Sequence, residues 1–575
     1  MLKRVFSYMK EYKKYAWSGL LCIGVEVVLE ITVPLLMADL IDYGVTNADG
    51  TYIIKKGLQM ALCAVLALIL GVGSAKFSAL AGQGLGANIR KAEYEKLQSY
   101  SFSNIDHFSV SSLVTRLTSD VTNIQNAVST GMRPFGRSPV MLIFATSFAF
   151  RINSTLALVF LVALPTLAVL LILIIINVGP LYGRMQSAID QVNRCIQENL
   201  TAIRVVKSYV RGDYEVEKFG VVNENLKSES EKAFGTAVLN MPAMQFVMYG
   251  TILGILLIGG RLINEGQMMI GQLTSFLSYV LLILNSLMMM SNVFLLMTRS
   301  LASAERIMEV IDEKIDITDE NAKDIAVAKG EIEFDHVWFK YKDTAKEYVL
   351  SDVSFHIKPG QTVGIIGQTG SSKTTLVQLI PRLYDVTKGE VKIDGINVKE
   401  YPVRHLRDSV AMVLQKNTLF SGSLIDNLRW GNENATLDEI KEACQIACVD
   451  EFVDRLADGY DTEMGQEGVN VSGGQKQRIC IARAILKKPK VLILDDSTSA
   501  VDTATEAKIR SGLAEKLPDM TKIIIAQRIS SVRHADQIII MDRGHVEAIG
   551  THESLLRDNQ IYQEIYASQK EGADL

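Results

Sequence analysis

The feature that most constrains this chain is the concentration of its long apolar runs in the first 300 of its 575 residues. A helix that crosses a bilayer needs about 20 largely apolar residues, because the hydrocarbon offers no water to bond its backbone. Six runs meet this requirement, and each predicts one membrane-spanning helix. They cover residues 15–42, 57–82, 135–152, 155–179, 240–263 and 270–298.

The segments between the runs predict the orientation of the chain. Residues 83–134 and 180–239 are polar, have helical periodicity and carry many Lys and Arg. The positive-inside rule therefore predicts that both are cytoplasmic extensions of the membrane helices. The short connections at residues 46–51 and 261–267 would then lie outside. The basic, aromatic N-terminal segment, residues 1–17, predicts an uncleaved helix on the cytoplasmic membrane surface.

Some side chains of the membrane half deserve separate predictions. Arg133 and Arg137 begin the third run, and we expect them to extend to the inner interface rather than bind substrate. Methionines crowd the last two runs. They either line an adaptable apolar cavity or fill space between helices and lipid, and the sequence leaves both readings open.

The composition changes after Asp312, where a charged stretch predicts a linker into a soluble α/β region. We expect a transmembrane domain over 1–305, a linker over 306–330 and the α/β domain over 331–575. The net charge of −5, without a concentrated basic stretch, argues against nucleic-acid binding. The six cysteines form no C-x-x-C pair, which indicates idle thiols in a reducing compartment.

A phosphate-binding loop is predicted within "TVGIIGQTGSSKTTLVQLI", where an apolar strand leads through a glycine-containing loop into a helix. Gly367 and Gly370 let the backbone curl around phosphate oxygens, and Lys373 reaches the outer phosphates. Thr374 offers its hydroxyl to Mg²⁺. Ser372 stands where the pattern has its second Gly, so we expect weakened geometry at most, provided that no glycine-only dihedral is needed there.

Two further motifs accompany this loop. "SGGQ", Ser472 to Gln475, precedes an amphipathic basic helix, and a later apolar strand ends in Asp495 and Asp496. With these motifs the chain resembles an ATP-binding cassette exporter subunit over nearly its whole length. The resemblance implies six transmembrane helices with long cytoplasmic extensions, fused to an α/β P-loop nucleotide-binding domain.

The resemblance also implies roles for individual residues, because two such domains sandwich two ATP molecules head to tail. Tyr341 would stack on adenine, Gln415 would sense Mg²⁺, and Asp495 would hold Mg²⁺ through water. The residues expected at the chain's own ATP are Tyr341, Gly367, Gln368, Thr369, Gly370, Ser371, Ser372, Lys373, Thr374, Thr375, Gln415 and Asp495, with Thr374, Gln415 and Asp495 nearest Mg²⁺. Those expected to reach the other subunit's ATP are Ser472, Gly473, Gly474 and Gln475.

Two positions depart from the family pattern. Asp496 replaces the Glu that polarises the attacking water, which withdraws the carboxylate by about 1–1.5 Å. Gln527 replaces a His that contacts the γ-phosphate, and an amide carries no titratable proton. Ser372 belongs to the same composite site, whereas the signature is intact apart from Val471. This asymmetry predicts a heterodimer whose second subunit carries the catalytic Glu and His.

We therefore expect a subunit of an ATP-driven exporter in the cell membrane, with the N-terminus and nucleotide domain cytoplasmic. It would move hydrophobic or amphipathic drugs, lipids or peptides out of the cytoplasm or inner leaflet, with hydrolysis mainly at the partner's site. One alternative is a slow homodimeric exporter in which Asp496 acts as a weak base. Another is an ATP-gated channel or sensor.

Overall fold

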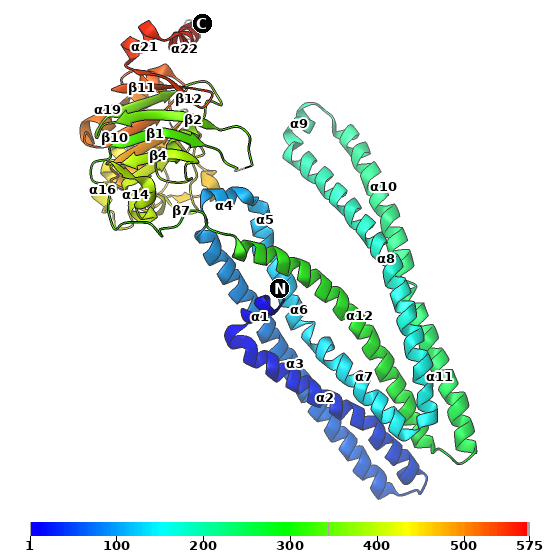
Figure 1. Cartoon of the computed structure of the whole chain (residues 1–575). Helices are drawn as coiled ribbons and strands as arrows, with labels where there is room; N and C mark the ends of the chain where they lie inside the picture. Colours follow the sequence, from blue (N-terminus) through cyan, green and yellow to red (C-terminus); the bar gives the residue numbers. More distant parts are fainter. Residues whose placement is uncertain (1, 343, 498–499, 572–575) are drawn as a thin grey trace. The chain divides into compact units, whose positions relative to one another are not determined.

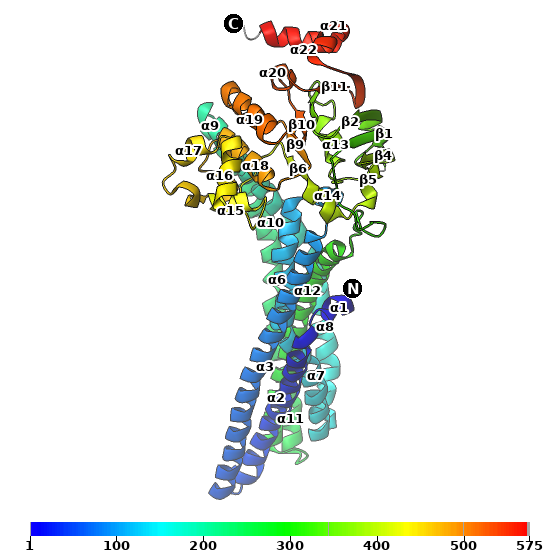
Figure 2. The same cartoon turned by 90° about the vertical axis from the view of Figure 1, so that its left-hand side faces the viewer.

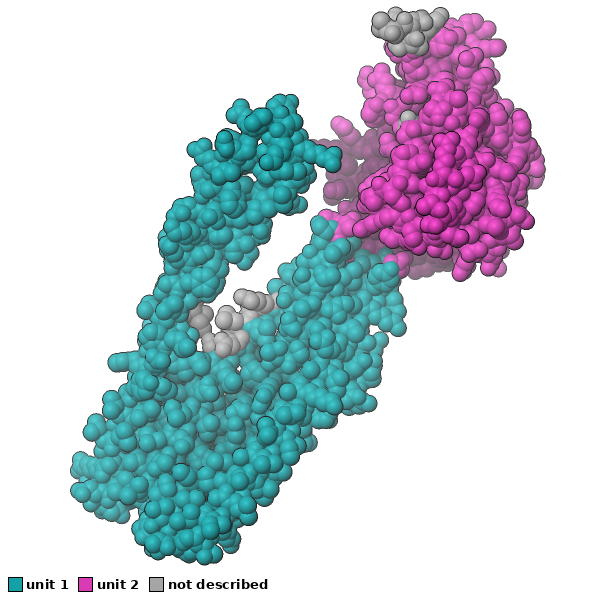
Figure 3. Space-filling view, turned by 180° about the vertical axis from the view of Figure 1, so that it is seen from behind, with its two compact units in different colours: residues 1–97, 111–312 teal, residues 98–110, 313–575 magenta. Residues whose placement is uncertain are grey.

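The protein is described by a computed structural model that covers residues 2–342, 344–497 and 500–571. The chain forms two compact units, coloured separately in Figure 3. Unit 1 comprises residues 1–97 and 111–312, and unit 2 comprises residues 98–110 and 313–575.

Unit 1 is built from helices, and each predicted membrane run lies in one continuous helical segment (Figure 1). Its α-helices are α1 (Leu2–Ser7), α2 (Lys13–Asp39), α3 (Gly50–Gln98), α5 (Val110–Thr115), α6 (Val121–Ser129), α7 (Met132–Ile152), α8 (Ser154–Thr201), α9 (Ile203–Ser208), α10 (Gly212–Ala237), α11 (Asn240–Asn264) and α12 (Ile270–Asp312). Short 3₁₀ or π segments cover Lys10–Tyr12, Leu40–Val45 and Arg116–Asp120.

Among the described residues, five helical stretches are long and apolar enough to cross a membrane. They are Lys10–Val45, Gly50–Gln98, Ser154–Thr201, Gly212–Asn264 and Ile270–Met290. The remaining predicted run, the third, forms the 21-residue helix α7, whose three arginines lower its mean hydropathy. The helix count is thus consistent with six spans.

The polar stretches between the runs are helical, as predicted. α3 has 49 residues and is about 73 Å long, more than twice the roughly 30 Å of hydrocarbon in a bilayer. α8 has 48 residues and also runs well beyond a bilayer's thickness, and α10 packs along it, with α9 at their tip (Figure 1). Figure 3 shows open space between this pair and the other helices of unit 1.

Inside the bundle, two side chains of α12 form hydrogen bonds to backbone carbonyls of α2 near a proline. Pro34 lacks an N–H and so interrupts the hydrogen-bond ladder of α2. The Ser275 hydroxyl donates to the Pro34 carbonyl, and the buried Tyr279 hydroxyl donates to the Ile31 carbonyl at 2.7 Å. The carbonyl that loses its helical donor is that of Glu30, four residues earlier, so these two bonds instead add a second donor to carbonyls of α2 and hold α2 against α12.

Unit 2 is an α/β structure with two main sheets (Figure 2). The six-stranded sheet has the order β12-β11-β3-β10-β9-β6, and the four-stranded sheet has the order β2-β1-β4-β5. The strands are β1 (Ile332–Phe339), β2 (Leu350–Ile357), β3 (Thr362–Ile366), β4 (Lys388–Ile393), β5 (Ile396–Asn397), β6 (Val410–Val413), β7 (Gly422–Ser423), β8 (Glu463–Met464), β9 (Val491–Asp495), β10 (Thr521–Ile525), β11 (Gln537–Asp542) and β12 (His545–Gly550).

The helices of unit 2 are α4 (Phe102–His107), α13 (Lys373–Gln378), α14 (Val403–Ser409), α15 (Leu424–Arg429), α16 (Leu437–Ile446), α17 (Asp450–Val453), α18 (Gly473–Leu486), α19 (Thr503–Lys516), α20 (Ile529–Val532), α21 (His552–Asp558) and α22 (Gln560–Glu571). Helices α15, α16, α18 and α19 pack on one side of the larger sheet, and α13 and the smaller sheet lie on the other (Figure 2). Every residue of β9 and β10 is buried, and their apolar runs, Val491–Leu494 and Ile523–Ile525, favour this central position in the sheet.

The segment 98–110 packs with unit 2 although its neighbours in sequence belong to unit 1. Its helix α4 places the Phe102 ring edge-on against Tyr384, with ring centres 6.0 Å apart. The Tyr384 hydroxyl donates to the Asp106 carboxylate at 2.6 Å, and Asn104 donates to the Lys314 carbonyl at 2.8 Å. Aromatic packing and several polar contacts, among them a second bond from Asn104 to the Glu313 carboxylate, thus attach this helix to the rest of unit 2.

Replacing Tyr384 with Phe should loosen α4 selectively, because it removes the bond to Asp106 but keeps the aromatic packing. A lost hydrogen bond of about 1 kcal/mol corresponds to roughly fivefold faster amide exchange in residues 98–110, measurable by hydrogen–deuterium exchange. Tyr401→Phe is the matched control, because the buried Tyr401 hydroxyl bonds the Ile393 carbonyl elsewhere in unit 2. Equal exchange of α4 in wild type and Tyr384→Phe would contradict this role.

Candidate functional site

The candidate site lies where four parallel strands of the large sheet end side by side. β3 pairs with β10, β10 with β9, and β9 with β6, all in parallel. Ile525 of β10 is opposite both Ile365 of β3 and Asp495 of β9. Ligands of such sheets bind at the carboxyl ends of the strands. The predicted loop, Asp495, Asp496, Gln415 and Gln527 all follow these ends.

The predicted phosphate loop connects β3 to α13, and its glycines are required by sterics. A side chain at Gly367 would place its Cβ only 2.2 Å from the Met541 carbonyl oxygen. Gly370 has φ +86°, a conformation that L-residues rarely adopt. The Lys373 amine donates to the Gly367 and Gln368 carbonyls at 2.9 and 2.8 Å. Burial lowers the pKa of Lys373, while the charges of Asp496 and Asp495 oppose that shift.

Ser372 occupies a left-handed conformation, with φ +70° and ψ 23°. The sequence analysis expected only weakened geometry if no glycine-like dihedral were needed, and that condition is not met. A left-handed residue with a Cβ is less stable by about 1–2 kcal/mol. Its side chain makes no capping hydrogen bond to α13 that would offset this strain. The loop therefore keeps the backbone conformation expected with Gly at this position, but Ser372 is strained in it.

Thr374 and Asp495 lie together beneath the loop. The Thr374 hydroxyl donates to Asp495 Oδ1 at 3.0 Å, and Asp495 is 1% exposed. Burial raises the pKa of Asp495, and the Thr374 hydrogen bond opposes the shift. Within the described part of the chain, Asp495 Oδ2 is buried and has no hydrogen-bond partner. A carboxylate oxygen and a hydroxyl in this setting suit Mg²⁺ with its water shell, which would supply the missing donor.

Asp496 and Gln527 are in direct contact. The Gln527 amide donates to Asp496 Oδ2 at 2.9 Å, so one oxygen of the shortened carboxylate is already engaged. Burial raises the pKa of Asp496, while this hydrogen bond and the charge of Lys373 lower it. Asp496 itself has φ +49°, which Asp tolerates better than most residues. Asp496 and Gln527, the two residues that differ from the family pattern, are thus hydrogen-bonded to each other.

Gln569 is a residue of this site that sequence reasoning missed. From α22 its amide donates to the Gln527 carbonyl at 2.8 Å, and its side-chain oxygen accepts from the Ile529 N–H at 2.8 Å. These two bonds hold the backbone on both sides of the turn after β10. The C-terminal helix carries no motif, so only the fold reveals this contact.

Tyr341, the predicted adenine contact, is held in place by neighbouring side chains, whereas Gln415, the predicted Mg²⁺ sensor, is exposed and apart from the other predicted Mg²⁺ residues. Tyr341 bonds the Thr375 hydroxyl at 2.9 Å and packs edge-on against Tyr384, yet remains 45% exposed. It is therefore fixed beside α13 with part of its ring accessible. Gln415 is exposed beyond β6, and no contact among the described residues joins its side chain to Thr374 or Asp495.

The signature residues form a separate group at the start of α18. Ser472 Oγ accepts from the Gln475 N–H at 3.3 Å, and Gln475 accepts from the Ser472 N–H at 2.8 Å. This capping box leaves the helix N-terminus ordered, which is a favourable place for an anion. In the described ranges, no hydrogen bond or ion pair joins these residues to the loop at 367–375 of the same chain.

Replacing Ser372 with Gly should stabilise the loop, because Gly adopts the left-handed conformation without a Cβ penalty. Allowing for the entropy of Gly, the gain should be about 0.5–1 kcal/mol. It should appear as a higher thermal midpoint of unit 2 and tighter ATP binding. Ser371→Gly is the matched control: Ser371 is buried and its hydroxyl accepts from Lys373 at 3.2 Å, so this change should destabilise. A lower midpoint for Ser372→Gly would contradict the strain.

Comparisons with known proteins agree with this architecture. Residues 17–287 match the family described as the ABC transporter transmembrane region, and residues 350–499 match the family described as ABC transporter. An uncharacterized ABC transporter ATP-binding protein of Bacillus subtilis, YfiB, is 38% identical over 575 residues, 100% of both chains. A Staphylococcus aureus relative, whose name includes "multidrug export ATP-binding/permease protein", is 32% identical over 99% of this chain and 100% of its own.

A solved structure described as "a bacterial Atm1-family ABC exporter with ATP bound" has a similar fold. It superposes with a TM-score of 0.83 at 23% identity, over 97% of this chain and 99% of that one. This likeness concerns the fold, and the family follows from the sequence relatives. The chain belongs to the ATP-binding cassette (ABC) transporter family, with the fused transmembrane and ATP-binding units of an ABC exporter.

Proposed function

We propose that this chain is one subunit of a heterodimeric exporter, and that its own site binds ATP with Mg²⁺ but hydrolyses it poorly. The observation that carries the proposal is the 2.9 Å hydrogen bond from Gln527 to Asp496. It joins a carboxylate of reduced reach to an amide without a titratable proton. The signature residues Ser472 to Gln475 would complete the hydrolytic site of a second subunit that carries a catalytic Glu and His.

Hydrolysis requires a water oxygen to attack the γ-phosphorus while the bond to the ADP leaving oxygen breaks. Asp496 would have to orient this water and accept its proton in a fixed geometry. Its missing methylene and its hydrogen bond to Gln527 both work against this role. A misplacement of about 1 Å can lower a rate about 100-fold. Reach, rather than basicity, is therefore the proposed defect.

Apart from the strain at Ser372, the parts expected to hold ATP have no comparable defect. Lys373 can turn its amine from the loop carbonyls to phosphate oxygens, and Tyr341 exposes part of its ring for adenine. Thr374 and Asp495 would hold Mg²⁺, which neutralises charge on the phosphate oxygens when bound. Gln415 would complete this group only after a movement of its loop. Retained binding with weak hydrolysis is the combination expected of a degenerate site.

Transport would follow from the difference in ATP affinity between two conformations. Two ATP molecules would close the paired ATP-binding units, and hydrolysis at the partner's site would reopen them. Several relatives have names that include multidrug export, which supports hydrophobic or amphipathic substrates such as drugs, lipids or peptides. We place the protein in the cell membrane, with the ATP-binding unit and N-terminus cytoplasmic.

The chain purified alone in lipid nanodiscs should bind ATP but turn it over about 100-fold below a typical enzyme rate of ~10 s⁻¹. Because its signature departs from the family pattern only at Val471, Asp496→Glu combined with Gln527→His should raise this rate at least about tenfold without a second subunit. Release of phosphate measures both. Asp519→Glu, the same chemical change at an exposed position of unit 2, should have no effect.

Other outcomes would favour the alternatives. Turnover near 10 s⁻¹ by the unmodified chain alone, coupled to transport, would support a homodimer and exclude a degenerate site. Ion current across the membrane without coupled turnover would support an ATP-gated channel.

A further inference from the structure

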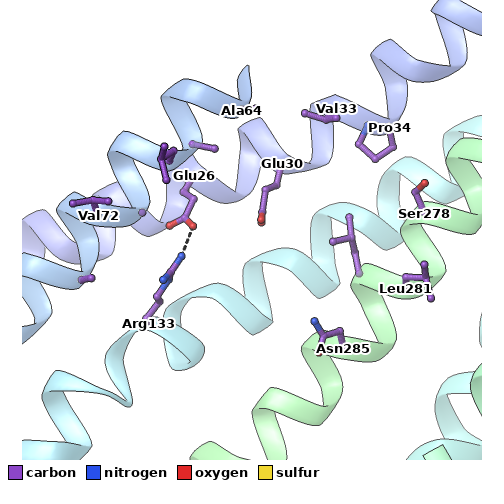
Figure 4. Close-up of a pocket in the computed structure, with 15 residues that line it drawn as sticks. Glu26, Glu30, Val33, Pro34, Ala64, Val72, Arg133, Ser278, Leu281 and Asn285 are labelled. Carbon is purple, nitrogen blue, oxygen red and sulfur yellow. Dashed lines mark hydrogen bonds and ion pairs between the residues drawn. The ribbon is translucent and has the colours of Figure 1, made fainter. Parts of the chain in front are cut away.

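A cavity of about 790 Å³ lies inside unit 1, between α2, α3, α7 and α12 (Figure 4). This volume is in the range of sites for drug-sized molecules. Its wall contains two carboxylates, Glu26 and Glu30 of α2, and one guanidinium, Arg133 of α7. Ionisable groups within membrane segments are energetically unfavourable, and they commonly face a functional cavity.

Glu26 has an unused hydrogen-bond acceptor in this cavity. It is 4% exposed, and its Oε1 accepts from Arg133 at 2.6 Å and from Arg137 at 3.3 Å. Its Oε2 is buried and has no hydrogen-bond partner among the described residues. A buried carboxylate oxygen without a donor destabilises the protein. A ligand that donates a hydrogen bond to this oxygen therefore gains more binding free energy than one whose partner was already hydrogen-bonded.

The cavity exists because α3 presents small residues to α2. Ala64, Ala67, Gly71 and Ala75 line its wall at helical spacing. A Cβ at Gly71 would stand 3.2 Å from Glu26 Oε1 and 3.3 Å from the Arg133 guanidinium, so a larger residue there would require these side-chain ends to shift by a few tenths of an ångström. The remaining wall is largely aliphatic. The space therefore combines an apolar body with one charged end.

We propose that this cavity binds amphipathic amines, whose apolar part fills the aliphatic space and whose protonated nitrogen donates an N–H to Glu26 Oε2. The inference names the substrate class of the exporter proposed above and rests on that function. Arg137, which is not among the lining residues, pairs with Glu30 at 2.6 Å and with Glu26 at 3.3 Å, so the four charges balance. The Oε2 of Glu26, unpartnered within the described part of the chain, therefore selects a donor, rather than an excess of charge. An anionic ligand would meet both carboxylates.

Arg133 competes with such a ligand, because its guanidinium already occupies Oε1 of the same carboxylate. Its side chain is 42% exposed, whereas the Glu26 side chain is 5% exposed. Without the Arg133 guanidinium, both the negative charge and the Oε1 acceptor of Glu26 would be available to a ligand amine. The two members of this pair therefore predict opposite effects on binding, which a merely structural ion pair does not.

The test measures equilibrium binding of radiolabelled dodecylamine to the full-length chain in lipid nanodiscs without ATP, against empty nanodiscs. Dodecyltrimethylammonium has the same tail and charge but no N–H, and should bind about tenfold more weakly. Glu26→Gln should weaken dodecylamine binding about tenfold and remove the difference between the two cations. Arg133→Gln should strengthen dodecylamine binding. Glu265→Gln, which breaks the exposed Arg261–Glu265 pair, is the matched control.

Equal binding of the two cations, tighter binding of dodecanoate, or unchanged binding in Glu26→Gln would each overturn the proposal. If Glu26→Gln does not fold, Ala67→Phe decides, because it places a large side chain in the aliphatic part of the cavity without touching the charges and should weaken dodecylamine binding at least about tenfold. Since no ATP or second subunit is present, failure here leaves the heterodimer proposal untouched. Conversely, normal turnover by the single chain would refute the degenerate site and not this cavity.

Discussion

The parallel pairing of β3, β10, β9 and β6 is the constraint on which the ATP-binding unit depends. Backbone hydrogen bonds between neighbouring parallel strands fix their register, so their carboxyl ends share one edge. A slip by one residue would turn every side chain to the other face. Segments separated by more than a hundred residues, such as Thr374 and Asp495, thereby come within hydrogen-bond distance.

Binding and hydrolysis place different demands on this edge. Holding phosphates needs backbone amides, a lysine and a metal-ligating pair, and these tolerate the strain observed at Ser372. Activating water needs a carboxylate placed to within about 1 Å. Here the carboxylate of Asp496 accepts a hydrogen bond from Gln527 instead of being free to orient water. Gln569 in turn donates to the Gln527 carbonyl and so holds Gln527 in place. In the proposed degenerate site, the same scaffold would keep the first capability while losing the second.

The membrane unit follows a related rule, because charges there must be paired or lie in a cavity. The sequence predicted that Arg133 and Arg137 extend to the interface; the structure adds that both pair with acids of α2. The reason is that Glu26 and Glu30, one helical turn apart, face α7. Two acids four residues apart in an apolar run were the signal that could have pointed to this cluster.

The sequence by itself determined the division into a helical membrane part and an α/β part, the six spans and the phosphate loop, because periodicity and motif spacing are local properties. It also identified Asp496 and Gln527 as unusual. Only the tertiary structure decided that Ser372 is left-handed, that Gln569 holds the turn after β10, and that Glu26 meets Arg133 beside a cavity. Each of these depends on packing between segments distant in sequence, which no local pattern encodes.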